Sequence, residues 1–252
     1  MLIVVSPAKK LDFETKAPVE KFTQPQFLDK SKKLIRDLKK CEPSEISKMM
    51  KLSQNLTDLN VERYQKFKTP FNLNNSKQAM FAFKGDTYVG LDAETMSSKN
   101  ITYAQNHLRI LSGLYGLISP LDLIRPYRLE MGTKFPCEGA KNLYEYWQDT
   151  VTESVNKILK KEKTLVVLAS KEYFSAIDFK KLAGEVITPV FKEKKNGEYK
   201  IVSFFAKKAR GMMSRYIIDH QIETPKELLK FDLDGYQYRK DLSTPHGPVF
   251  CR

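Results

Sequence analysis

The sequence has few cysteines and few histidines, and neither type is clustered. Its three cysteines are odd in number and far apart, so they imply no disulfide framework and fit a reducing compartment. Its three histidines form no His/Cys pair at the spacing of metal ligands. We therefore expect no metal site and no bound cofactor.

Long apolar runs are also missing. The first run, Leu2–Val5, is far too short for the core of a secretion signal, and lysines follow it rather than precede it. No run approaches the length of a membrane span. We expect a cytoplasmic protein with no membrane partner.

Several enzyme signatures are absent. The chain has no G-x-x-x-x-G-K-[ST] loop, no G-x-G-x-x-G fingerprint and no G-x-S-x-G elbow. Asp92, Glu130 and Glu172 fall near expected loops, where acids usually cap helices or face water. No residue pattern identifies a catalytic group. Enzymatic activity therefore stays uncertain, and a non-enzymatic binding protein is favoured.

Acidic residues are outnumbered. Lysine and arginine total 43 against 30 aspartates and glutamates, which gives a net charge of +13 and a pI of about 9.4. Such a balance favours polyanionic partners such as nucleic acid, an anionic membrane surface or phosphorylated substrates. A generally basic proteome, or a role of the charge in solubility, would explain the same composition.

Length and pattern predict one α/β domain over residues 1–252. The chain is long enough to bury a substantial core, and it shows no repeat and no flexible linker. Two continuous apolar runs, 2–5 and 165–168, are typical of strands covered on both faces. Asn196-Gly197 between the runs 186–194 and 198–204 predicts a hairpin. Helices are expected over 27–38, 43–52, 57–67, 97–111, 120–124, 144–159 and 205–218, with a last one from 225, and further strands over 79–83 and 88–89.

Two of the expected strands end alike. Val5 runs into Ser6-Pro7-Ala8-Lys9-Lys10, and Leu168 runs into Ala169-Ser170-Lys171. In open α/β sheets, ligands bind beyond the carboxyl ends of the strands. A hydroxyl and a lysine at such an end suit a phosphate, although a helix cap beside a solvated lysine would look the same.

The segment from Leu108 to Lys134, LRILSGLYGLISPLDLIRPYRLEMGTK, carries two glycines three residues apart. We expect a hairpin between two short helices here, whose uncovered amides bind a phosphate. Arg125, Arg128 and Lys134 would hold the rest of the strand. The alternative is a plain helix end and connector.

The expected helix over 205–218 carries Lys207, Lys208, Arg210 and Arg215 within nine residues and has no acid among them. These charges would repel one another unless an anion lies near, because a solvated helix face normally mixes signs. The pattern therefore indicates a binding surface.

Five segments together resemble a known family. They are SPAKK at the start, YVGLDA from Tyr88, the segment from Leu108 to Lys134, LASKEYF from Leu168, and VSFFAKKARGMMSRYII from Val202. In this order, and over nearly the whole chain, they resemble the YaaA family, also called DUF328 or UPF0246. The resemblance implies a cytoplasmic bacterial protein of the hydrogen peroxide (oxidative) stress response that limits unincorporated iron and oxidative DNA damage. It also implies a single-domain mixed α/β fold with a positively charged cleft and a helix-hairpin-helix element at about 100–125.

The resemblance further implies binding of duplex or branched DNA without marked sequence preference, and no obligatory protein partner is evident. From the resemblance and the patterns above, these residues are expected to bind DNA: Lys9, Lys10, Ser112, Gly113, Tyr115, Gly116, Arg125, Arg128, Lys134, Lys207, Lys208, Arg210 and Arg215.

Two other functions remain open to test. The first is a nucleic-acid-processing or nucleotide-processing enzyme that uses the basic cleft as a substrate pocket, which a narrow pocket lined by Lys9, Tyr127 and Glu130 would favour. The second is direct iron binding, against which the sequence argues because it has no carboxylate–histidine cluster at ligand spacing.

Overall fold

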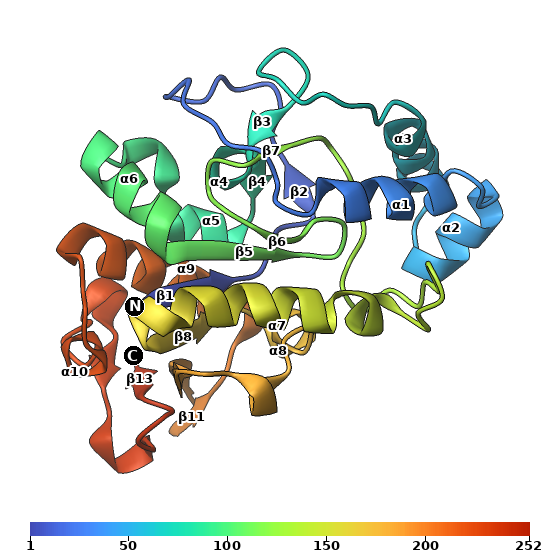
Figure 1. The fold of residues 1–252 in the computed structure, drawn as a ribbon. Helices are drawn as coiled ribbons and strands as arrows, with labels where there is room; N and C mark the ends of the chain where they lie inside the picture. Colours follow the sequence, from blue (N-terminus) through green and yellow to red (C-terminus); the bar gives the residue numbers. More distant parts are fainter.

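The computed structural model describes residues 1–252, and a five-stranded sheet lies at their centre (Figure 1). Its strand order is β6-β5-β1-β8-β9. β1 pairs in parallel with both β5 and β8, β9 pairs in parallel with β8, and β6 is antiparallel to β5. The strands span Leu2–Val5 (β1), Leu108–Ser112 (β5), Gly116–Ile118 (β6), Thr164–Leu168 (β8) and Glu185–Ile187 (β9). The mixed α/β class is confirmed.

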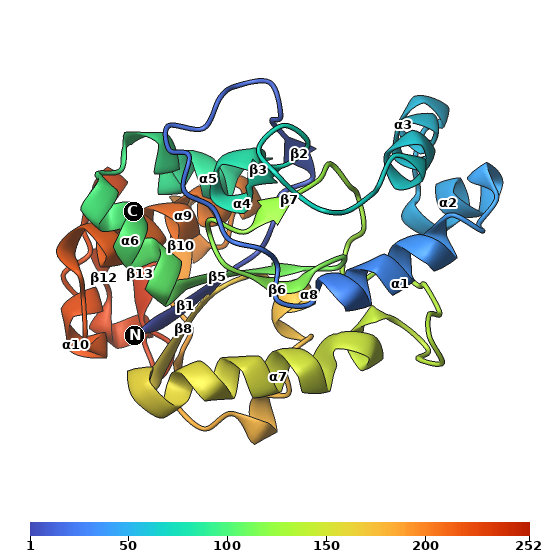
Figure 2. The ribbon, with the colours of Figure 1, turned by 45° about the horizontal axis from the view of Figure 1, so that its top comes forward.

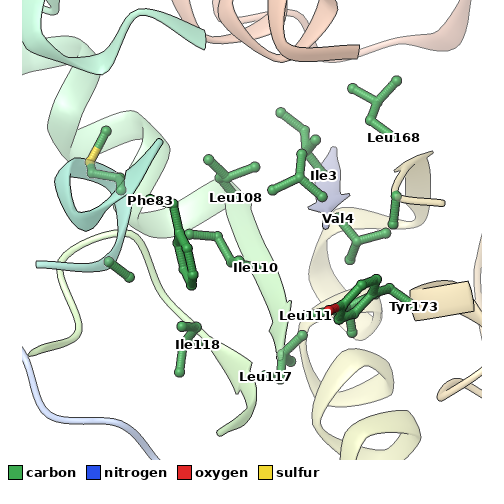
Figure 3. Packing of buried hydrophobic residues seen from close by; sticks show 14 of the residues in the cluster. Ile3, Val4, Phe83, Leu108, Ile110, Leu111, Leu117, Ile118, Leu168 and Tyr173 are labelled. Carbon is green, nitrogen blue, oxygen red and sulfur yellow. The ribbon is translucent and has the colours of Figure 1, made fainter. Parts of the chain in front are cut away.

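Helices cover both faces of this sheet, which explains its continuous apolar strands. α7 (Leu143–Glu162) packs on one face, and α9 (Ser203–His220) packs against β1 and β8 on the other (Figure 2). Every residue of β1 and β8 is buried. Ile3, Val4 and Leu168 belong to one buried hydrophobic cluster with Leu108, Ile110, Leu111, Leu117 and Ile118 of β5 and β6 (Figure 3). The sequence predicted both strands for this reason.

A second sheet has the order β11-β10-β13-β12. The predicted hairpin is confirmed in it, since Asn196 and Gly197 have φ of +53° and +84°, as the tight turn of a two-residue hairpin requires. The strands are β10 (Val190–Lys195), β11 (Glu198–Lys200), β12 (Gln237–Tyr238) and β13 (Val249–Cys251).

The remaining elements are short or lie at the periphery. Two small ribbons pair β2 (Lys10–Leu11) with β4 (Phe83–Lys84) and β3 (Lys77–Gln78) with β7 (Leu123–Ile124). The other helices are α1 (Leu28–Leu38), α2 (Pro43–Met50), α3 (Gln54–Gln65), α4 (Ala79–Ala82), α5 (Asp86–Leu91), α6 (Ser98–His107), α8 (Lys171–Phe174) and α10 (Pro225–Leu228). Four single-turn 3₁₀ helices cover Ala93–Thr95, Phe179–Lys181, Leu233–Gly235 and Lys240–Leu242. None of the helices combines the length and the apolar character that crossing a membrane requires.

Some predicted elements are wrong. The expected strand over 79–83 is the helix α4 up to Ala82, with only Phe83 extended at the start of β4, and the expected strand over 88–89 is part of the helix α5. Ala79–Ala82 is buried throughout and Tyr88-Val89 is only two residues long, so neither run shows a diagnostic period. The helix expected through Leu111 ends at His107, and Leu108 becomes extended to pair with Ile3. No helix covers 120–124, where Asp122 instead accepts hydrogen bonds from the Ser119 amide (2.7 Å) and the Thr23 hydroxyl (2.6 Å).

The expected helix-hairpin-helix element is also wrong. Residues 108–118 form a β-hairpin of β5 and β6, in which Ser112 pairs with Gly116. The Ser112 hydroxyl accepts the Tyr115 amide at 3.0 Å and closes the turn. The turn therefore joins two strands, and no helix lies on either side of its glycines.

A close crossing of α5 and α9 fixes the position of the basic helix. A Cβ at Gly90 would lie 2.1 Å from the Lys208 carbonyl oxygen, and one at Gly211 would lie 1.9 Å from the Thr87 carbonyl oxygen. The two backbones thus touch directly, as only glycine allows. The crossing holds Lys207 and Arg210 beside the segment that begins α5.

Replacing Gly211 with alanine should destabilise the protein, even though alanine favours helices by about 1 kcal/mol. The added methyl group forces α5 and α9 apart, and we expect a loss of about 3 kcal/mol, or a fall in Tm of about 6–12 °C. Thermal unfolding followed by circular dichroism measures it. Lys157→Ala, at an exposed position of α7, is the control and should shift Tm little; a Gly211→Ala protein as stable as the original would contradict the close crossing.

Candidate functional site

The parallel strands change their direction of winding between β1 and β8. β5 follows β1 in the chain and lies on one side of it, whereas β8 lies on the other. In open α/β sheets, a ligand crevice forms at such a switch point, outside the carboxyl ends of the strands. Ser6 follows β1 and Ser170 follows β8 at this point, and the Ser6 hydroxyl accepts a hydrogen bond from the Ser170 amide at 2.8 Å. The two similar strand ends of the sequence are therefore neighbours in space.

A cavity of about 370 Å³ lies at this point, and we call it the switch-point cavity. Five segments that are distant in the sequence line it, including the two that follow β1 and β8. Besides residues 6–10, they contribute Lys84–Thr87 before and within α5, Tyr127–Glu130, Glu172 and Tyr173, Lys207, and Arg210. The volume lies in the range of small-molecule sites.

Cations outnumber carboxylates around this cavity. The six cationic side chains are Lys9, Lys10, Lys84, Arg128, Lys207 and Arg210, and the three carboxylates are Asp86, Glu130 and Glu172. Glu130 pairs with Lys9 at 2.7 Å and with Arg128 at 3.4 Å, while Lys84 pairs with Glu94. Three of the predicted residues remain without a carboxylate partner: Lys10, Lys207 and Arg210.

Arg210 is the most constrained of these free cations. Its side chain is half-buried, and no hydrogen bond or ion pair holds its guanidinium. Burial lowers the pKa of Arg210, yet a guanidinium keeps its charge at any physiological pH. A partly desolvated cation without a partner is unfavourable by itself, which marks the place where an anionic ligand would stabilise the protein.

Two tyrosines form part of the cavity lining. Tyr127 is buried and its hydroxyl hydrogen-bonds to that of Ser112 at 2.7 Å, while Tyr173 stands on α8. Burial raises the pKa of both phenols well above the ordinary value, so both remain neutral. Glu172, the neighbour of Tyr173, accepts the Gly132 amide at 3.0 Å.

A second cavity of about 900 Å³ adjoins the first, and we call it the adjoining cavity. The two share Lys10, Lys84, Gly85 and Asp86 in their linings, so they are adjacent. Arg125 lines the adjoining cavity and donates to the Lys68 carbonyl oxygen at 3.3 Å. Arg63 and Lys66 of α3 line it as well.

The glycine turn is remote from solvent. Ser112, Gly113, Tyr115 and Gly116 are all buried, so the expected phosphate-binding amides are not exposed. Packing explains the glycines: a Cβ at Gly113 would lie 2.3 Å from the Leu129 carbonyl oxygen, and one at Gly116 would lie 2.6 Å from the Trp147 ring. The Trp147 indole also donates to the Gly113 carbonyl oxygen at 2.8 Å. The turn belongs to the core, and these four residues are corrected as site residues.

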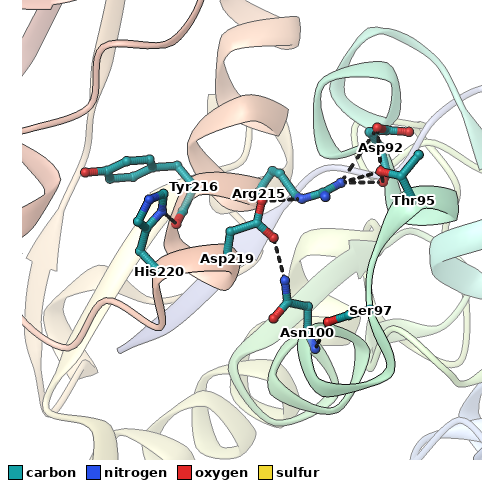
Figure 4. Close-up of polar contacts among 8 residues, drawn as sticks. All are labelled: Asp92, Thr95, Ser97, Asn100, Arg215, Tyr216, Asp219 and His220. Atoms are coloured by element: carbon teal, nitrogen blue, oxygen red, sulfur yellow. Dashed lines mark hydrogen bonds and ion pairs between the residues drawn. The ribbon is translucent and has the colours of Figure 1, made fainter.

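Two of the four cations of α9 are already paired within the chain. Lys208 contacts Asp234 at 3.2 Å. Arg215 donates to Asp219 at 2.7 Å, to the Asp92 carbonyl oxygen at 2.7 Å and to the Thr95 hydroxyl at 2.8 Å (Figure 4). The sequence has no acid among the four cations, but the structure supplies carboxylates to this pair from other segments and from the next turn of α9. Lys208 and Arg215 line neither cavity.

The other residues expected to bind DNA also fall into two groups, those that line a cavity and those that do not. Lys9, Lys10, Arg128, Lys207 and Arg210 meet at the switch-point cavity. Lys134 is exposed and lines neither cavity. The sequence reasoning missed Lys84 and Asp86, because it interpreted the Gly85-Asp86 turn as a link between two strands rather than as the start of α5. No group of three or more histidine, cysteine, aspartate or glutamate residues is arranged to hold a metal ion.

The fold and the site define a class: a basic α/β protein with a cation-rich cavity at the switch point of a mostly parallel sheet. Comparison with known proteins gives the family. A family model described as "Peroxide stress protein YaaA" matches residues 1–242, and the chain belongs to this family. It is 52% identical to a UPF0246 protein of Shewanella loihica and 50% identical to one of Alteromonas mediterranea, in each case over 100% of this chain and 98% of the relative.

Arg215 and Arg210 should respond differently to removal. Arg215→Ala removes the hydrogen bonds that the guanidinium donates to Asp219, to the Asp92 carbonyl oxygen and to the Thr95 hydroxyl, so we expect a loss of about 2–3 kcal/mol in the free energy of unfolding. Arg210→Ala leaves no acceptor unpaired and should cost about 1 kcal/mol or less. Urea unfolding of both variants measures the difference, and equal losses would contradict these separate roles.

Proposed function

We propose that this protein binds duplex or branched DNA, mainly through the phosphates and with little sequence preference, as part of the peroxide stress response. Binding of this kind would limit iron-driven oxidative damage to DNA. One observation carries the proposal: Lys10, Lys207 and Arg210, which come from two distant parts of the chain, meet at one cavity without carboxylate partners.

The adjacency of the two cavities supports a linear ligand. Lys207 and Arg210 line only the switch-point cavity and Arg125 lines only the adjoining cavity, while Lys10 and Lys84 line both. Phosphate contacts of this kind position a strand and carry no sequence information. The proposed DNA track therefore runs along the adjoining cavity and past the switch-point cavity, and it uses Lys9, Lys10, Arg125, Arg128, Lys207 and Arg210.

The family supports the biological setting. The model that matches residues 1–242 carries the description of a peroxide stress protein, and the net charge of +13 suits a polyanionic partner. The proposal does not use Ser112, Gly113, Tyr115 or Gly116, which are buried.

The triple variant Lys10→Ala/Lys207→Ala/Arg210→Ala should weaken DNA binding and flatten its salt dependence. Each lost phosphate contact lowers the log–log slope of affinity against salt by about 0.9, so three lost contacts lower it by about 2.7. Filter-binding titrations of a duplex at several salt concentrations measure this slope.

The matched control removes the same charge elsewhere. Lys157, Lys160 and Lys161 are exposed on α7, form no ion pair, and line neither cavity. Their triple alanine variant should keep nearly the full slope. An unchanged slope in the cavity variant, or an equal fall in both variants, would count against the proposed DNA track.

A second function has its own supporting observation. The switch-point cavity brings together Lys9, Tyr127 and Glu130, the three residues expected to line the pocket of a nucleotide-processing or nucleic-acid-processing enzyme. Glu130 retains acceptor capacity beside its contacts with Lys9 and Arg128, so it is the candidate acid or base.

This enzyme hypothesis predicts a change of mass in a substrate. Oligonucleotides and nucleotides incubated with the protein, then examined by mass spectrometry, should yield a new species that Glu130→Gln abolishes. Unchanged masses across both sets of substrates would leave DNA binding without a reaction.

A further inference from the structure

The switch-point cavity has features that a bare phosphate strand does not need. Three carboxylates line it beside its six cations. Carboxylates repel phosphates and accept hydrogen bonds, so this lining suits a ligand that carries hydrogen-bond donors as well as negative charge. The cavity also encloses only about 370 Å³, which is the size of a small-molecule site and leaves no room for a duplex.

The cavity lining includes aromatic and apolar side chains that suit a flat ring. Tyr127, Leu129 and Tyr173 are buried residues of its lining. The two phenols are held neutral by burial, and aromatic side chains stack on the bases of nucleic acids. Glu130 and Glu172 stand among these residues in the sequence and line the same cavity, where they can accept the N–H groups of a base.

Three cations of the cavity lining are unpaired or incompletely paired. Arg210 has no partner for its guanidinium, and Lys207 has none for its ammonium group. Arg128 is the third such cation, because its Nε is the one buried side-chain polar atom of the chain without a hydrogen-bond partner. Three incompletely paired cations in one lining suit the oxygens of a phosphate.

We propose that the switch-point cavity receives a single nucleoside phosphate unit, turned out of the bound DNA strand. Its phosphate lies against Arg210 and Lys207, and its base lies among Tyr127, Tyr173 and the carboxylates of Glu130 and Glu172. This inference rests on the proposed function, because the DNA track through the adjoining cavity delivers the strand. Extrusion of a nucleotide is easiest where its base is mispaired or damaged.

The test uses a duplex that carries 2-aminopurine at a mismatch, because the emission of this base rises when it leaves the stack. The original protein should raise the emission severalfold on binding. Ser170→Trp places a bulky ring in the cavity lining, so it should lose the rise in emission when it is compared at a protein concentration that saturates duplex binding. Ser175→Trp is the matched control, since Ser175 is exposed at the other end of α8 and does not line the cavity.

The outcomes separate the two proposals. Binding of the duplex without a rise in emission, or an equal rise with Ser170→Trp, overturns the extrusion and leaves the proposed function standing. Absence of any duplex binding overturns the proposed function, and the source of the nucleotide is then tested with free deoxyadenosine monophosphate.

The free-ligand measurement is a calorimetric titration with deoxyadenosine monophosphate, deoxyribose 5-phosphate and inorganic phosphate. The expected result is at least tenfold tighter binding of the nucleotide than of the two base-free ligands, and its loss in Ser170→Trp but not in Ser175→Trp. Equal binding of all three ligands, or no binding in a protein that also fails to extrude the base, overturns the nucleotide site. This arm needs no DNA affinity, and it decides the question if Ser170→Trp alone fails to fold.

Discussion

The parallel pairing of β1 with β8 is the constraint on which the rest of the molecule depends. Its register runs from Leu2 beside Leu165 to Val5 beside Leu168, and both strands are buried along their whole length. A slip of one residue would reverse which faces their side chains pack against, so the core fixes the register. That register places Ser6 beside Ser170, and the chain that leaves each strand supplies part of the cavity lining.

The four cations of α9 fall into two pairs with different surroundings. Lys208 and Arg215 face carboxylates that other segments provide, and these pairs hold the helix in place. Lys207 and Arg210 instead line the cavity without such partners. In the sequence the four cations form one uniform pattern, because Asp92 and Asp234 are distant from them along the chain. Only the fold separates the structural cations from those available to a ligand.

The elements that the sequence predicted well have a strong and unambiguous pattern. β1 and β8 are continuous apolar runs, Asn196-Gly197 dictates a hairpin, and α7 and α9 are long and amphipathic. The errors lie in short buried segments. Over Ala79–Ala82 every residue is buried, so neither a helical nor a strand period is visible. The glycines of the 112–116 turn are explained by contact with Trp147 and the Leu129 backbone, which no local pattern reveals.

The candidate site was predictable in part. The chemistry at the ends of β1 and β8 and the cations at 207 and 210 could be identified because each follows a recognisable element. The contribution of Lys84 and Asp86 could not, since it depends on α5 being a helix. The family was recognisable from its segments, and the matched model agrees with it; the hairpin element that the resemblance implied is a pair of buried strands.

The crossing at Gly90 and Gly211 has a mechanical consequence. Where backbone rests on backbone, there is no intervening layer of side chains whose rotamers can rearrange. The segment that carries Lys84 and Asp86 and the helix that carries Lys207 and Arg210 therefore move as one rigid piece. Adaptation to the shape of a ligand falls to the long, exposed side chains of Lys9 and Lys10.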